Sequence, residues 1–134
     1  MGDRAVFGFR DSVDSPTIYL YSHWGGASQR VDLIRAVGKA RPRWSDAAYA
    51  TRICISELVG TDWSQELGFG VSVGTFCEPD YETMQVVTWD DQTVSLMLTR
   101  SPHDEIQKVS FAEFENTADR FDEPALFYDE EVEA

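Results

Sequence analysis

IYLYSHWGG, residues 18–26, is the stretch on which our expectation of the fold rests. Its first part alternates aliphatic and aromatic side chains, which favours a β-strand. His23 and Trp24 then lead into Gly25 and Gly26, and a helical pattern follows. A strand that ends in two glycines before a helix places backbone N–H groups, a stacking ring and an imidazole together, as in sites that bind anions or nucleotides.

The neighbouring segments extend this pattern to a mixture of strands and helices. Residues 4–10 also alternate, so we expect them to form an N-terminal hairpin with residues 17–22. Apolar side chains recur at helical spacing over residues 29–40, and again from the N-cap Ser45 to Gly60. These two segments predict the main helices.

Alternation returns in the second half of the chain. Residues 68–74 place apolar side chains on one face and glycine and serine on the other, and residues 84–89 and 92–98 predict a second hairpin. Phe111 and Phe114 are the expected core anchors of a short last helix. We therefore predict an α+β fold with an antiparallel sheet of about five strands, two main helices and a short C-terminal helix.

Charge is distributed unevenly along the chain, whose net formal charge is −13. Residues 104–134 hold eleven acidic side chains and two basic ones, whereas residues 30–52 hold six basic and two acidic ones. We expect a single domain over residues 1–128, followed by an acidic, flexible tail over residues 129–134. Duplex nucleic acid and anionic membranes are disfavoured as partners, because phosphate recognition needs a net basic surface.

The sequence shows neither a membrane-spanning apolar stretch nor a secretory pattern, so we expect a cytoplasmic protein. Cys54 and Cys77 lack the spacing of a metal site, and we expect both to be buried free thiols. His23 and His103 lie outside nucleophile motifs, and the glycine pair lacks the spacing of phosphate-binding loops. We therefore expect no catalytic residues, no bound metal and no cofactor.

A binding constellation remains around the glycine pair. Aromatic faces stack on bases and arginine forks hold phosphates, so a nucleotide would use all of its groups. The alternative is that the aromatic residues pack in the core and the arginines face solvent. The candidate ligand-binding residues are Tyr19, Tyr21, His23, Trp24, Gly25, Gly26, Arg30 and Arg35.

Several segments resemble a family of small proteins encoded by actinobacterial phages and their hosts. The resemblance extends over about residues 4–100 and rests on RAVFGFR (4–10), YLYSHWGG (19–26), PRW (42–44), YATR (49–52) and GFGV (68–71). No known chemistry is attached to these motifs. The resemblance implies a genomic context, that of an accessory protein which counters host defence in the cytoplasm of an infected bacterium.

The leading hypothesis is a phage accessory protein that binds and sequesters a small anionic ligand, such as a nucleotide signal, without catalysis. One alternative is an acidic interaction module that mimics nucleic acid and inhibits a basic host protein. The second alternative is a nucleotide-modifying enzyme that acts through His23. The identity of the ligand, the host target and the formation of a homo-oligomer are left open by the sequence.

Overall fold

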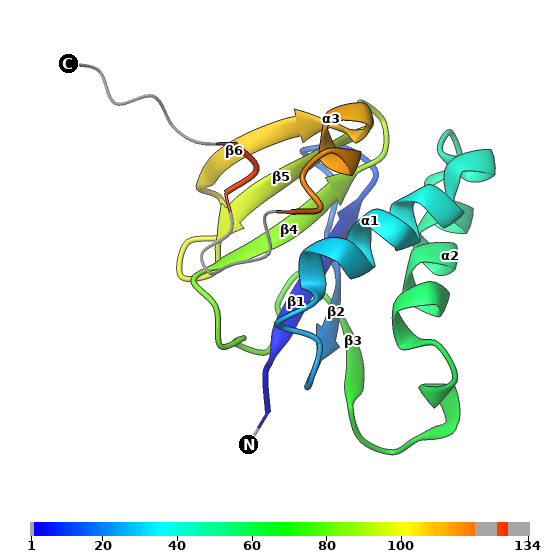
Figure 1. Ribbon diagram of the computed structural model, residues 1–134, viewed down its shortest axis with the longest axis vertical. Coiled ribbons are helices and arrows are strands. Elements are labelled where there is room, and N and C mark those ends of the chain that lie inside the picture. Colours follow the sequence, from blue (N-terminus) through cyan, green and yellow to red (C-terminus); the bar gives the residue numbers. More distant parts are fainter. Residues whose placement is uncertain (1, 120–125, 129–134) are drawn as a thin grey trace.

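The computed structural model describes residues 2–119 and 126–128. One six-stranded sheet, with the order β3-β2-β1-β4-β5-β6, forms its centre (Figure 1). β1 and β4 are parallel, and every other neighbouring pair is antiparallel. The strands are β1 (Ala5–Arg10), β2 (Ile18–Ser22), β3 (Phe69–Val73), β4 (Thr83–Thr88), β5 (Thr93–Leu98) and β6 (Glu105–Ser110).

This mixed sheet confirms the α+β class and corrects the prediction of about five antiparallel strands. Both predicted hairpins, β1–β2 and β4–β5, are present. After β1 the chain forms β2, both long helices and β3. It then enters the sheet again as β4, which lies beside β1 and runs parallel to it. β6 was not predicted because its sequence, EIQKVS, is largely polar and hides the alternation of the buried Gln107 and Val109 with the exposed Lys108.

Two long helices, α1 (Gln29–Lys39) and α2 (Ala47–Val59), cover one face of the sheet (Figure 1). The side chain of Asp46, and not that of Ser45 as predicted, caps α2 by accepting a hydrogen bond from the backbone N–H of Tyr49. Gly60 ends the helix with a φ of 65°, a conformation that glycine adopts without strain. Short 3-10 turns, η1 (Arg41–Arg43) and η2 (Asp62–Ser64), follow the two helices.

The main core lies between the helices and the sheet. Phe7, Phe9 and Leu20 project from the strands against Leu33 of α1 and Cys54 of α2, and all five side chains are buried. The opposite face of the sheet has a smaller buried cluster formed by Val6, Tyr19, Met84, Val86 and Met97. Phe76, from the segment between β3 and β4, packs on Tyr19 with 4.9 Å between ring centroids.

The short last helix, α3 (Phe111–Glu115), follows β6 directly. Ser110 and Glu113 form a reciprocal capping box at its start, which satisfies two backbone N–H groups. Phe111 and Phe114 are buried, as predicted, and the ring of Phe111 contacts that of Trp89. The predicted acidic tail, residues 129–134, lies outside the described residues.

Candidate functional site

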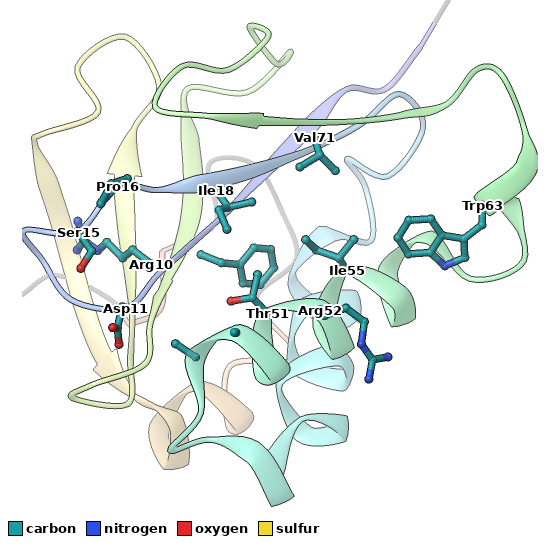
Figure 2. Close-up of a pocket in the computed structure, with 13 residues that line it drawn as sticks. Arg10, Asp11, Ser15, Pro16, Ile18, Thr51, Arg52, Ile55, Trp63 and Val71 are labelled. Carbon is teal, nitrogen blue, oxygen red and sulfur yellow. The ribbon is translucent and has the colours of Figure 1, made fainter.

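An open groove of about 640 Å³ lies beside the edge strand β3, between α2 and the strands β2 and β3 (Figure 2). Leu20 of β2 is fully buried, whereas its neighbour Val71 on β3 is 57% exposed on the same face. Val73 is 64% exposed on that face. The helical layer therefore ends over β2 and leaves the edge strand uncovered, which creates the groove.

The groove has mainly apolar walls. Phe9 of β1 and Ile18 of β2 belong to the sheet side of the lining. Thr51 and Ile55 of α2 face Ile18 across the groove (Figure 2). Trp63 of η2 stands at the opposite end from the Ser15–Pro16 loop (Figure 2). The full lining is Phe9, Arg10, Asp11, Ser15, Pro16, Ile18, Ala47, Ala48, Thr51, Arg52, Ile55, Trp63 and Val71. This size and composition are typical of sites for small organic ligands.

Polar groups lie at defined positions around these walls. The Thr51 hydroxyl oxygen accepts a hydrogen bond from the indole N–H of Trp89, at 2.9 Å, so its position is fixed from the core side. Arg10 Nε donates to the hydroxyl of Thr88 at 2.8 Å. Arg52 Nη1 donates to the hydroxyl of Ser56, at the longer distance of 3.4 Å.

The two groove arginines are not among the described cations that form ion pairs. Among the described residues, ion pairs join Arg4 to Asp80, Arg35 to Asp32 and Glu57, Arg41 to Glu115, and Lys108 to Asp91. None of them includes Arg10 or Arg52. Asp11 also lines the groove, next to Arg10 in sequence, whereas Arg52, on the α2 border of the groove, has no acidic neighbour in sequence. A guanidinium of this kind can receive a carboxylate or phosphate.

Three residues of the predicted nucleotide site do come together at the end of β2. The Tyr21 hydroxyl lies 2.7 Å from His23 Nδ1, and the imidazole packs edge-on against the ring of Trp24, with 4.7 Å between centroids. The indole of Trp24 is 63% exposed. This corner therefore presents an aromatic surface to solvent.

The backbone groups of the same corner are already occupied by Asp3. Its backbone N–H donates to the carbonyl of His23, and its carbonyl accepts from the N–H of Gly26, both at 2.8 Å. Its carboxylate accepts from the N–H of Ala27 at 2.7 Å and from the hydroxyl of Tyr81. An internal carboxylate thus fills the anion position that the sequence predicts for a ligand.

Close packing explains why positions 25 and 26 are glycine. A Cβ on Gly26 would collide with Asp3 and the ring of Tyr81, and one on Gly25 would collide with the side chain of Ser22. The two glycines allow the chain to pass close to these groups before α1 begins. Their presence therefore follows from this close packing and does not require a ligand.

The structure holds the other three predicted residues in separate contacts. Tyr19 is buried against Phe76 on the face of the sheet opposite the helices. Arg30 is 2% exposed under α1, where its Nε donates to Gln85 Oε1 at 2.5 Å and its guanidinium lies over the Phe127 ring. Arg35 is engaged on the helix surface by Asp32 and Glu57.

Sequence reasoning missed the groove because its lining comes from four separate segments: residues 9–18, residues 47–55, Trp63 and Val71. One signal was present in the sequence. The strand 69–73 carries apolar side chains on one face, and only the arrangement of the helices determines that this face remains uncovered.

The thiols offer little chemistry. Cys54 is buried in α2, and burial raises the pKa of its thiol to about 12, so it is protonated at neutral pH. Cys77 is exposed, which corrects the expectation that both thiols are buried. In the part of the chain that the structure describes, no group of three His, Cys, Asp or Glu residues is arranged to hold a metal ion.

Comparisons with known proteins give no relative: no family model matches the chain, and neither a curated protein nor a solved structure is detectably similar to it. Among the described helices, none has the length and apolar character needed to cross a membrane. The function therefore has to be inferred from the geometry of the groove.

Proposed function

We propose that the protein is a non-catalytic binding protein whose groove takes a small amphipathic ligand with an anionic end. The observation that carries this proposal is the combination of an apolar groove of about 640 Å³ with an arginine at its border that has no ion-pair partner among the described residues. Sequestration of the ligand, and not its conversion, is the activity that such a site supports.

The apolar walls favour a ligand with a hydrocarbon or aromatic body. Ile18, Ile55 and Val71 offer side chains to such a body, and each buried methylene contributes about 0.8 kcal/mol before the costs of binding are subtracted. Val71 is more than half exposed in the absence of a ligand. Covering it removes apolar surface from water, which favours binding.

The positive charge favours an acidic group at the open side of the groove. A guanidinium binds carboxylate or phosphate through two parallel hydrogen bonds. The hydrogen bond that Arg52 makes among the described residues goes to the neutral hydroxyl of Ser56, so most of its N–H donors are available for a ligand. Since the protein as a whole is strongly acidic, a cation that borders the apolar groove and has no carboxylate partner there would favour an anionic ligand.

This proposal keeps the small anionic ligand of the sequence hypothesis but moves it from the Trp24 corner to the groove. A nucleotide as that ligand, and a role against host defence, stay predictions. The contacts of Asp3 with Gly26 and Ala27 favour the groove, since they fill the backbone donors that a phosphate at the corner would need.

Isothermal titration with octanoate, decanoate and dodecanoate tests the proposal. We expect the affinity to rise about fourfold for each added methylene, the factor that corresponds to about 0.8 kcal/mol. Replacing Arg52 by glutamine is expected to weaken decanoate binding and to leave the binding of uncharged decanol unchanged. Arg41→Gln is the matched control, because Arg41 is an exposed arginine paired with Glu115.

Two results of this titration series would overturn the proposal. One is the same affinity for all three chain lengths, which would show that no apolar groove is filled. The other is equal weakening by Arg41→Gln and Arg52→Gln, which would show that decanoate responds only to the overall charge. Tight binding of a cyclic or linear nucleotide that is lost in Trp24→Ala and retained in Arg52→Gln would return the site to the Trp24 corner.

A further inference from the structure

The outer edge of β3 lacks the features that normally keep a sheet edge from pairing with another strand. In the described part of the chain β3 has one neighbour, β2, and its sequence FGVSV contains no charge and no proline. The opposite edge strand, β6, carries the exposed charges Glu105 and Lys108. The Gln107 side chain on β6 also binds the backbone of Phe127 and Tyr128. The β6 edge is therefore protected by charge and by side-chain contacts, whereas the β3 edge is not.

The hydrogen bonds to β2 determine which backbone groups of β3 face outward. The N–H of Gly74 donates to the carbonyl of Thr17 at 2.9 Å, and the N–H of His23 donates to the carbonyl of Gly68 at 2.8 Å. In an antiparallel pair the bonded residues alternate along the strand, so the even-numbered residues of β3 bond to β2. Phe69, Val71 and Val73 therefore present their N–H and carbonyl groups to the open edge.

We propose that two copies of the chain pair through β3 in antiparallel orientation, with a two-fold axis at Val71. A closed dimer needs an edge that is complementary to itself. The outward-facing residues Phe69 and Val73 each lie two positions from Val71, so Val71 would lie opposite its own copy. Phe69 would lie opposite Val73 in both halves, an aromatic and β-branched pair of the kind that stabilises antiparallel strands. The three bonded pairs supply about six inter-strand hydrogen bonds.

Charge favours this edge over the rest of the surface for contact between copies. Two chains with a net charge of −13 repel each other, but residues 67–77 contain no acidic or basic side chain. Val71 and Val73 are also among the most exposed apolar side chains, and pairing would cover them. Val71 lines the groove, so the Val71 of the second copy would lie next to it and extend the apolar wall on the open side.

The mass in solution is the first test, and it requires no ligand. In sedimentation equilibrium we expect the mass to rise with concentration from 15.2 kDa to twice that value. Val71→Lys places two like charges opposite each other at the axis, and Val71→Pro removes an outward N–H without breaking a bond to β2. Both variants are expected to remain at the mass of one chain, whereas Val13→Lys, at an equally exposed loop residue, is expected to behave as the wild type.

Cysteine cross-linking tests the register. In a Cys77→Ser background, a cysteine introduced at position 71 is expected to form a disulfide with its copy, because opposite residues in a bonded pair lie about 5.5 Å apart at Cα. A cysteine at position 73 is the control, since the two copies of this residue would be separated by about 13 Å along the strands. The Phe69→Cys and Val73→Cys variants, when mixed, are expected to cross-link with each other.

Three outcomes would overturn the proposal. The first is the mass of one chain at every concentration up to the limit of solubility, which would leave the edge to a foreign strand or to none. The second is a dimer that persists in Val71→Pro. The third is cross-linking at position 73 as efficient as at position 71, which would show another register or random collision.

Discussion

Removing the carboxylate of Asp3 is expected to loosen the Trp24 corner and to expose an anion site that the native protein fills internally. Asp3→Ala leaves the N–H of Ala27 and the hydroxyl of Tyr81 without this acceptor. A hydrogen bond to a charged group contributes about 1.5–3 kcal/mol, and water reaches the Ala27 contact, so we expect a loss of about 2 kcal/mol in total. With an unfolding entropy of about 0.3 kcal/mol/K for a chain of 134 residues, Tm falls by about 7 °C.

Thermal unfolding followed by circular dichroism measures this change, with Asp14→Ala, at an exposed residue between β1 and β2, as the control. We further expect phosphate to raise the Tm of Asp3→Ala more than that of the wild type, because an added anion can accept from the vacated N–H of Ala27 and the hydroxyl of Tyr81. A Tm unchanged by Asp3→Ala, or equal effects of phosphate on both proteins, would refute the reasoning that an internal anion occupies this corner.

Three further expectations follow from local geometry. Asp80→Asn should lower Tm at pH 7, because the Arg4 guanidinium and backbone N–H hold the pKa of Asp80 below its usual 3.8. The carboxylate therefore contributes stability above pH 3.8, and this stability is lost as the pH falls through the folded-state pKa. The difference in Tm between Asp80→Asn and the wild type should accordingly shrink in acid. Gly60→Ala should cost about 1 kcal/mol in urea unfolding because φ is 65°, whereas Gly38→Ala, with open space around it in α1, should stabilise by up to about 1 kcal/mol. A thiol reagent at pH 8 should modify the exposed Cys77 rapidly and leave Cys54 unmodified until the chain unfolds. The reason is that Cys54 is buried, which raises the pKa of its thiol to about 12. Rapid reaction of both thiols would contradict the packing of α2.

Local patterns in the sequence were sufficient for much of the fold. The hairpin β1–β2 follows from two alternating segments close in sequence, and the ends of α1 and α2 agree with the prediction within one or two residues. Phe111 and Phe114 correctly indicated the last helix and its buried side chains. The parallel pairing of β1 with β4 could not be derived in this way, because it depends on how the helices return the chain across the sheet.

The candidate site was harder to predict for a related reason. The run of aromatic residues and glycines at 21–26 does form a corner, but Asp3, distant from Ala27 in sequence, supplies the acceptor that a ligand was expected to provide. Arg30 lies on the predicted helix, yet its side chain turns inward to Gln85. Residue type and spacing indicate which chemistry is available, whereas the contacts that consume it come from segments far apart in the chain.

Chemical-shift mapping of decanoate on the isotope-labelled protein tests the central claim most directly, because it locates the ligand as well as detecting it. Binding in the groove is expected to shift the backbone amide signals of Ile18, Thr51, Ile55 and Val71 and the indole signal of Trp63, all of which belong to residues that line it. The indole signal of Trp24 is expected to stay unchanged. Shifts centred on Trp24 and Ala27, or no saturable shifts at all, would contradict the assignment of the groove as the binding site.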